Sequence, residues 1–261
     1  MGKPFAGERA IVDMPEDPAE SLAHQFSTDI RILSEILSNR GLSDSGAREI
    51  YSASYRVRKR DGRARLLSFE VPNIDLKIDP DQRVMPDHVQ IDPRLLVDIT
   101  FEENLILEPA HYDIFDRVTK NEIKFQIRGR KGNRELLAYW HFDRHAYPLA
   151  ENSPCHPAFH FQFGGSTLRG ISDNIAGILL LEAPRHSAPP MDPILAIDVL
   201  VSHFNGPKWH ELRNQDRRYL TIVRRAQSRL WKPYFESISS DLDTLPQDHP
   251  LRETGLLPNI L

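Results

Sequence analysis

The chain has 261 residues, 40% of them hydrophobic and 27% charged, which is typical of a globular protein able to bury a sizeable core. Its net charge of −4 excludes binding of nucleic acid through an overall positive charge. Its single cysteine excludes an internal disulfide. The first residues lack the apolar run of a secretory signal, and no apolar stretch approaches about 18 residues. We therefore expect a cytoplasmic protein that does not contact a membrane.

The first predicted element is a helix that begins after Asp17. This aspartate is a good N-cap, and Pro18 suits the first helical position. Apolar residues then recur every three or four positions, as on one buried helix face. They are Leu22, Phe26, Ile30, Leu33 and Leu37. Gly41 is expected to end this helix.

A β-hairpin is predicted next. Apolar residues alternate over residues 51–57 and again over 67–71, and Asp61-Gly62 marks the turn between the two strands. Residues 72–95 are rich in proline and aspartate, so they are expected to form a long loop. A further strand is expected over residues 95–106.

A second hairpin follows, with alternating residues over 123–127 and a return strand over 136–145. Its turn is Lys131-Gly132-Asn133. A strand over 159–163 is expected to stop at Gly164-Gly165. The continuous apolar run over 178–181 indicates a central buried strand.

The C-terminal part is predicted to be helical. Asp192-Pro193 repeats the N-cap and first-position proline, and Asn205-Gly206-Pro207 is expected to close that helix. A long helix should follow from about Asn214, with Pro233 kinking or ending it. Its inward residues are expected to be Tyr219, Ile222, Val223, Ala226 and Leu230.

This order predicts an α+β fold with an N-terminal helix, antiparallel hairpins in one sheet and two C-terminal helices packed on it. We expect a flexible arm over residues 1–16, one domain over 17–240 and a tail over 241–261. The layout resembles the ubiquitin-conjugating fold, which also has a His-Pro step after its meander. Cys155 precedes His156-Pro157 here, whereas the cysteine of that fold follows the step, and no asparagine follows Pro157. The resemblance implies a similar layout of elements only.

Histidines are concentrated between positions 141 and 160, where four of the eleven lie together with the only cysteine. Side chains alternate along strands, so His141, Asp143 and His145 share one face. If the two phenylalanine-bearing faces both point to the core, His160 and Gln162 fall on that same side, opposite Trp140 and Phe161.

Such a face could bind a metal, because imidazole and carboxylate are good ligands of zinc, iron or manganese. His141 and His145 are about 13 Å apart along an extended strand. The predicted ligands are therefore His141, Asp143 and His160, with zinc as the first candidate. The alternative is a polar sheet face whose histidines hydrogen-bond one another and water.

A thiol site is a second prediction. Cys155 could be a nucleophile if a neighbouring imidazole lowered the pKa of its thiol. Its base would be His145 or His160, oriented by Asp143. The alternative is a small residue buried in a loop. Arg185 and Gln162 are further candidates for ligand binding, Arg185 because a guanidinium can hold a carboxylate or phosphate.

Basic residues gather at the two predicted hairpin tips, where they could contact phosphates. The candidates for nucleic-acid binding are Arg58, Arg60, Arg63 and Arg130. Charges at exposed tips also discourage edge-to-edge pairing without any ligand. Two classes of function therefore remain: a metal- or thiol-dependent hydrolase or group-transfer enzyme, and a non-catalytic module that binds a protein or nucleic acid.

Overall fold

The computed structural model describes residues 18–57, 66–77, 90–102, 118–131, 133–144, 157–164 and 186–244. Its helices are α1 (Pro18–Asn39), α2 (Ser45–Arg56), α6 (Pro193–Phe204), α7 (Gly206–Gln215) and α8 (Arg217–Thr244). Its strands are β1 (Leu66–Asp75), β2 (Gln90–Glu102), β3 (Val118–Lys131), β4 (Arg134–Arg144), β5 (Phe159–Phe163) and β6 (His186–Ser187).

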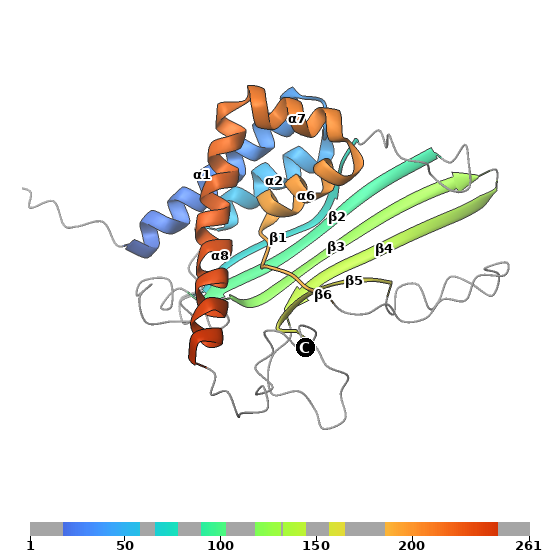
Figure 1. Ribbon diagram of the computed structural model, residues 1–261. Helices are drawn as coiled ribbons and strands as arrows, with labels where there is room; N and C mark the ends of the chain where they lie inside the picture. Colours follow the sequence, from blue (N-terminus) through green and yellow to red (C-terminus); the bar gives the residue numbers. More distant parts are fainter. Residues whose placement is uncertain are drawn as a thin grey trace, which may run out of the picture.

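The described strands form one sheet of six, in which every strand pairs antiparallel with the next one in sequence. The helices gather on one side of this sheet, and β2, β3 and β4 extend beyond them (Figure 1). The predicted α+β class is confirmed. The hairpin of β3 and β4 and the strand β5 are confirmed as well.

Helix α1 has the predicted apolar face. Phe26, Ile30, Leu33 and Leu37 are all buried. Gly41 follows the helix with a φ of 65°, and the Leu42 N–H donates to the Leu37 carbonyl at 2.8 Å. This is a Schellman ending, which favours glycine because other residues strain at positive φ.

The strand predicted over residues 51–57 is wrong, because this segment lies in α2 and its end. Its buried positions follow the helical period: Gly46, Ala47, Ile50, Ala53 and Ser54. Tyr51 and Tyr55 are exposed on the other side, and their hydroxyl groups hydrogen-bond at 2.8 Å. The apparent alternation therefore came from the two faces of a short helix. The return strand of the predicted hairpin exists as β1, and its partner is β2.

The loop predicted over 72–95 is also wrong at both ends. Strand β1 continues to Asp75, with a register shift between Val71 and Ile74, and β2 already begins at Gln90. Pro93 is paired in register with Ile127. Two of the prolines that indicated a loop, Pro72 and Pro93, therefore lie within strands. The apolar run over 178–181 lies outside the described residues, as do 1–17 and 245–261.

Three C-terminal helices are described where two were predicted. Asn205 closes α6 and also caps α7, since its side chain accepts a hydrogen bond from the Lys208 N–H at 3.2 Å. Pro207 is tolerated because the first turn of a helix needs no N–H there. Helix α8 begins at Arg217, passes through Pro233 and reaches Thr244, so it enters the predicted tail. All five residues predicted to face inward on α8 are buried.

Asp198 joins the three C-terminal helices. Its Oδ1 atom accepts from Trp209 Nε1 at 2.9 Å, from Arg213 Nε at 3.0 Å and from the Tyr219 hydroxyl at 3.1 Å. Burial raises the pKa of the Tyr219 hydroxyl far above its usual range, and the Asp198 carboxylate adds to the effect. Tyr219 therefore stays a neutral donor that locks α8 against α6.

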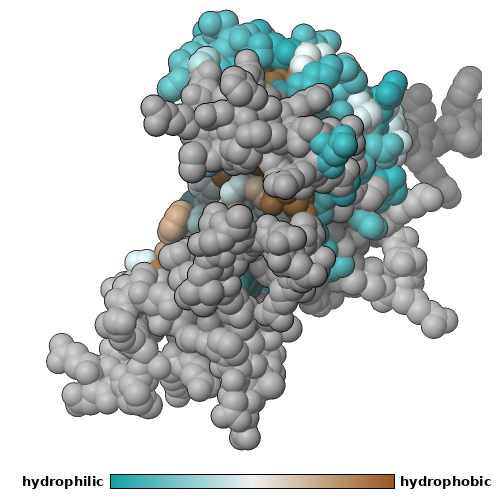
Figure 2. Space-filling model, turned by 90° about the vertical axis from the view of Figure 1, so that its right-hand side faces the viewer, coloured by the Kyte–Doolittle hydropathy of each residue, from teal (hydrophilic) through white to brown (hydrophobic). Residues whose placement is uncertain are grey.

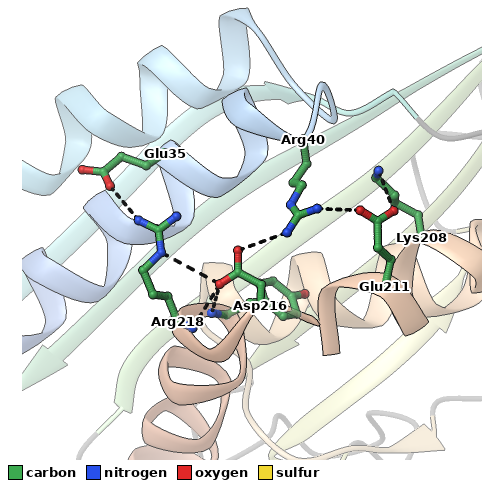
Figure 3. Close-up of polar contacts among 7 residues, drawn as sticks. Glu35, Arg40, Lys208, Glu211, Asp216 and Arg218 are labelled. Carbon is green, nitrogen blue, oxygen red and sulfur yellow. Dashed lines mark hydrogen bonds and ion pairs between the residues drawn. The ribbon is translucent and has the colours of Figure 1, made fainter. Parts of the chain in front are cut away.

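A chain of ion pairs lies across α1, α7 and α8 (Figure 3). Arg40 pairs with Glu211 at 2.6 Å and with Asp216 at 3.7 Å, and Arg218 reaches Glu35 at 3.4 Å. Lys208 completes it by pairing with Glu211 at 2.8 Å. Most of these groups are partly exposed, so the ion pairs add little to the free energy of unfolding. Their main effect is on the orientation of the helices.

The surface is not uniformly polar. Figure 2 shows hydrophilic atoms at the top of the molecule and separate patches of hydrophobic atoms below them. Phe163 and Val199 are among the large apolar side chains that stay exposed in the described part of the chain. The polar side chains discussed next lie on the face of the sheet opposite the helices.

Candidate metal centre

Strands β3, β4 and β5 present two chemically different faces. On the helix side, Phe125 contacts Phe161, Trp140 contacts Phe163, and Phe142 stacks on Phe159 with an interplanar angle of 13°. Residues one position away along each strand point to the other side. The helix-side packing therefore fixes where the polar residues of the opposite face must lie.

The polar face has two rows set by strand register. Glu122 of β3, Asp143 of β4 and His160 of β5 are partners across the ladders. Lys124, His141 and Gln162 form the neighbouring row. Partners on one face of adjacent strands have Cβ atoms about 4.5–5.5 Å apart, so their side chains can meet.

His141, Asp143 and His160 converge, as the alternation predicted. Each offers one ligand atom, and these three atoms lie within 4.8 Å of one another. His160 Nε2 is 2.8 Å from Asp143 Oδ1, and His141 Nε2 is 3.7 Å from Asp143 Oδ2. The Asp143 carboxylate therefore lies between the two imidazoles. This group could hold a metal ion.

His160 is the most enclosed member of the group, with a side chain only 1% exposed. Its Nδ1 atom lies 3.3 Å from the Pro157 carbonyl oxygen. Histidines that bind a metal usually donate their second N–H to such a carbonyl or to a carboxylate, which fixes ring orientation and tautomer. The Pro157 carbonyl thus leaves Nε2 as the atom that faces Asp143.

Glu122 and Lys124 form an ion pair beside the group, on β3. Hydrogen bonding to the Glu122 carboxylate raises the pKa of Lys124, against the opposing effect of partial burial. Lys124 is therefore an ammonium at neutral pH. Both side chains are more than a third exposed, whereas His141 and Asp143 are 16% and 28% exposed.

Among the other predicted site residues, Gln162 is placed beside the group. It is buried and is the register partner of His141. Cys155, His145 and Arg185 lie outside the described residues, so the thiol site stays a prediction. Arg58, Arg60 and Arg63 also lie outside them, and only the backbone of Arg130 is described.

Glu122, Lys124 and the Pro157 carbonyl were not among the site groups predicted from the sequence. A signal for the first two was present, because they alternate with Ile123 and Phe125 on a strand that the sequence did predict. Nothing in the sequence paired that strand with His141 in this register. The Pro157 carbonyl depends on the turn into β5, which alternation does not specify.

Comparison with protein-family models, with curated proteins and with solved structures finds no match for this chain. The resemblance to the ubiquitin-conjugating fold therefore stays a likeness in the order of elements. None of the described helices has the length and apolar character needed to cross a bilayer.

Proposed function

We propose that this protein is a metal-dependent hydrolase whose ion is bound by His141, Asp143 and His160. The observation that carries the proposal is the convergence of two imidazole nitrogens and one carboxylate oxygen within 4.8 Å. These groups come from two strands in fixed register, and apolar packing on the other face holds those strands. Zinc is the first candidate because it prefers nitrogen and oxygen ligands of this kind.

The spacing of the ligand atoms fits a metal of this size. With metal–ligand distances of about 2.0–2.1 Å, tetrahedral ligands lie about 3.3 Å from one another. His160 Nε2 lies 2.8 Å from Asp143 Oδ1 and His141 Nε2 lies 3.7 Å from Asp143 Oδ2, so each imidazole faces a different oxygen of the carboxylate, at a separation near that value.

The number of ligands among the described residues is the number that a catalytic zinc site uses. Structural zinc sites have four protein ligands, whereas catalytic sites have three and keep a position open for water or substrate. The group found among the described residues has three members. A metal in such a site lowers the pKa of its bound water to about 7, which supplies a hydroxide for hydrolysis.

Metal uptake by full-length protein purified without a histidine tag tests the first half of the proposal. We expect one zinc per chain by elemental analysis and by calorimetric titration of the stripped protein. Asp143→Asn and His141→Gln should lower zinc affinity by more than about a hundredfold, because outer-shell changes alone cost about 10- to 100-fold. His210→Gln is the matched control, since His210 is exposed on α7.

Hydrolysis of p-nitrophenyl acetate and bis(p-nitrophenyl) phosphate tests the second half. The zinc-loaded protein should hydrolyse at least one of them, and activity should disappear on stripping and in Asp143→Asn. Equal zinc binding by Asp143→Asn and His210→Gln would contradict the site. In that case the three side chains form a hydrogen-bonded polar face, the alternative that the sequence left open.

A further inference from the structure

The exposure of the side chains on the polar face decreases from β3 to β5. Side-chain exposure is 37% for Lys124 and 36% for Glu122 on β3, 28% for Asp143 on β4 and 1% for His160 on β5. Gln162 beside His160 is buried as well. Lys124 and Glu122 are therefore the more exposed side chains beside the three candidate ligands, among the residues that the structure describes.

The charge at the bound ion itself would favour an anion. A dication held by one carboxylate, that of Asp143, and two neutral imidazoles leaves one net positive charge at the ion. Glu122 and Lys124 cancel each other. Lys120 is exposed two residues before Glu122, and the register row of Glu122 continues through Asp98 of β2 to Glu70 of β1, so charges of both signs lie farther from the ion.

Lys124 is placed to contact a ligand at the metal. Its Cα is the register partner of that of His141, so the two Cβ atoms are about 4.5–5.5 Å apart. An ammonium has three donors, and the hydrogen bond to Glu122 needs one of them. Two N–H groups remain for an oxyanion, while Glu122 holds the ammonium against the sheet.

We propose that the substrate is an oxyanion, a carboxylate or a phosphate ester, held between the bound metal and the Lys124 ammonium. This inference rests on the proposed function, because it needs the metal at His141, Asp143 and His160. It assigns Lys124 as the residue that selects anionic over neutral substrates. Gln162 and His160 form the closed end of the site.

The test uses the full-length protein loaded with Co²⁺, whose visible spectrum reports on ligands at the open position. Inorganic phosphate, acetate and the neutral ligand imidazole are titrated separately. Phosphate or acetate should change the spectrum, and Lys124→Gln should weaken that anion by about tenfold, as expected when a charge-assisted hydrogen bond is lost. Affinity for Co²⁺ and for imidazole should be unchanged in Lys124→Gln.

Lys232→Gln is the matched control, because Lys232 is also ion-paired, with Glu236 on the exposed side of α8. A preference for phosphate points to phosphate esters, and a preference for acetate points to carboxylates. Equal anion affinity in Lys124→Gln and Lys232→Gln overturns this inference and leaves the metal site standing. Failure of the wild-type protein to bind Co²⁺ overturns the proposed function and this inference with it.

Discussion

His160 Nε2 lies 2.8 Å from Asp143 Oδ1, across a register in which these two residues are direct partners on β5 and β4. The same atoms that meet here are the ones that would bind a metal. An ion would therefore replace the direct contact between these two side chains with a coordinate link between the two strands. Metal binding and the attachment of β5 to the sheet are coupled for this reason.

The first prediction is that zinc stabilises the folded protein. A ligand that binds only the native state at 100 times its Kd adds about 2.7 kcal/mol to the free energy of unfolding. Thermal unfolding of the stripped protein should therefore shift upward on adding zinc. The shift should vanish in Asp143→Asn and persist in His210→Gln. An equal shift in both variants would assign the effect to binding elsewhere.

The second prediction concerns Gly46, at the start of α2. A Cβ at this position would lie 2.9 Å from the Asp75 backbone nitrogen and 2.6 Å from Ser43 Oγ. Gly46→Ala should lower the free energy of unfolding by roughly 1–3 kcal/mol, the usual cost of overpacking. Gly206→Ala is the control, because a Cβ there meets nothing within 4 Å. Chemical denaturation should show no loss of stability for Gly206→Ala.

The third prediction concerns Asp75, which caps α2 from a strand. Its Oδ1 atom accepts the Gly46 N–H at 2.7 Å and also accepts from the Ser45 hydroxyl, whereas Asp44 at the N-cap position makes no such bond. Asp75→Ala should cost about 0.5–2 kcal/mol, as loss of a helix cap does. Asp44→Ala should change stability by less than about 0.5 kcal/mol.

The cost of Asp75→Ala should depend on pH. Burial raises the pKa of Asp75, but the hydrogen bonds from Ser45 and Gly46 outweigh it, so the folded-state pKa is lowered. The stabilisation is therefore fully present above the unfolded value of about 3.9 and is lost as pH falls through the folded value. Denaturation from pH 7 to pH 3 should show the two proteins converging in acid. A gap that widened in acid would contradict this assignment.

The fourth prediction concerns Arg229, which joins three helices. From α8 it pairs with Asp192 at 2.7 Å and with Asp29 at 3.6 Å, and both carboxylates are fully buried. Asp192 also caps α6 by accepting the Leu195 N–H. Arg229→Met should cost about 3–5 kcal/mol, because two buried charges lose a partner.

Arg224→Met is the control for that substitution, since Arg224 is exposed on the same helix. Its stability in urea should match that of the wild type within about 0.5 kcal/mol. An equal, small effect of both substitutions would show that water or Arg225, which lies 2.9 Å from Asp29, compensates for the missing guanidinium.

Sequence periodicity was sufficient to predict those helices and strands that bury one face against a single layer. The stripe of α1, the alternation of β3 and β4 and the inward residues of α8 follow directly from burial against a single layer. The same alternation put His141, Asp143 and His160 on one side of the sheet. It failed over 51–57, because four alternating positions fit a strand and a short amphipathic helix equally well.

Tertiary structure alone decided which strands are neighbours and in what register. That register sets Asp143 against His160 and Glu122 against Asp143, and a shift of one residue would have moved each side chain to the other face. It also let Asp75 of β1 cap α2, a contact between residues 29 positions apart. The sequence determines which side chains share a face. Long-range strand pairing determines which of them meet, because it depends on packing between segments that local patterns do not connect.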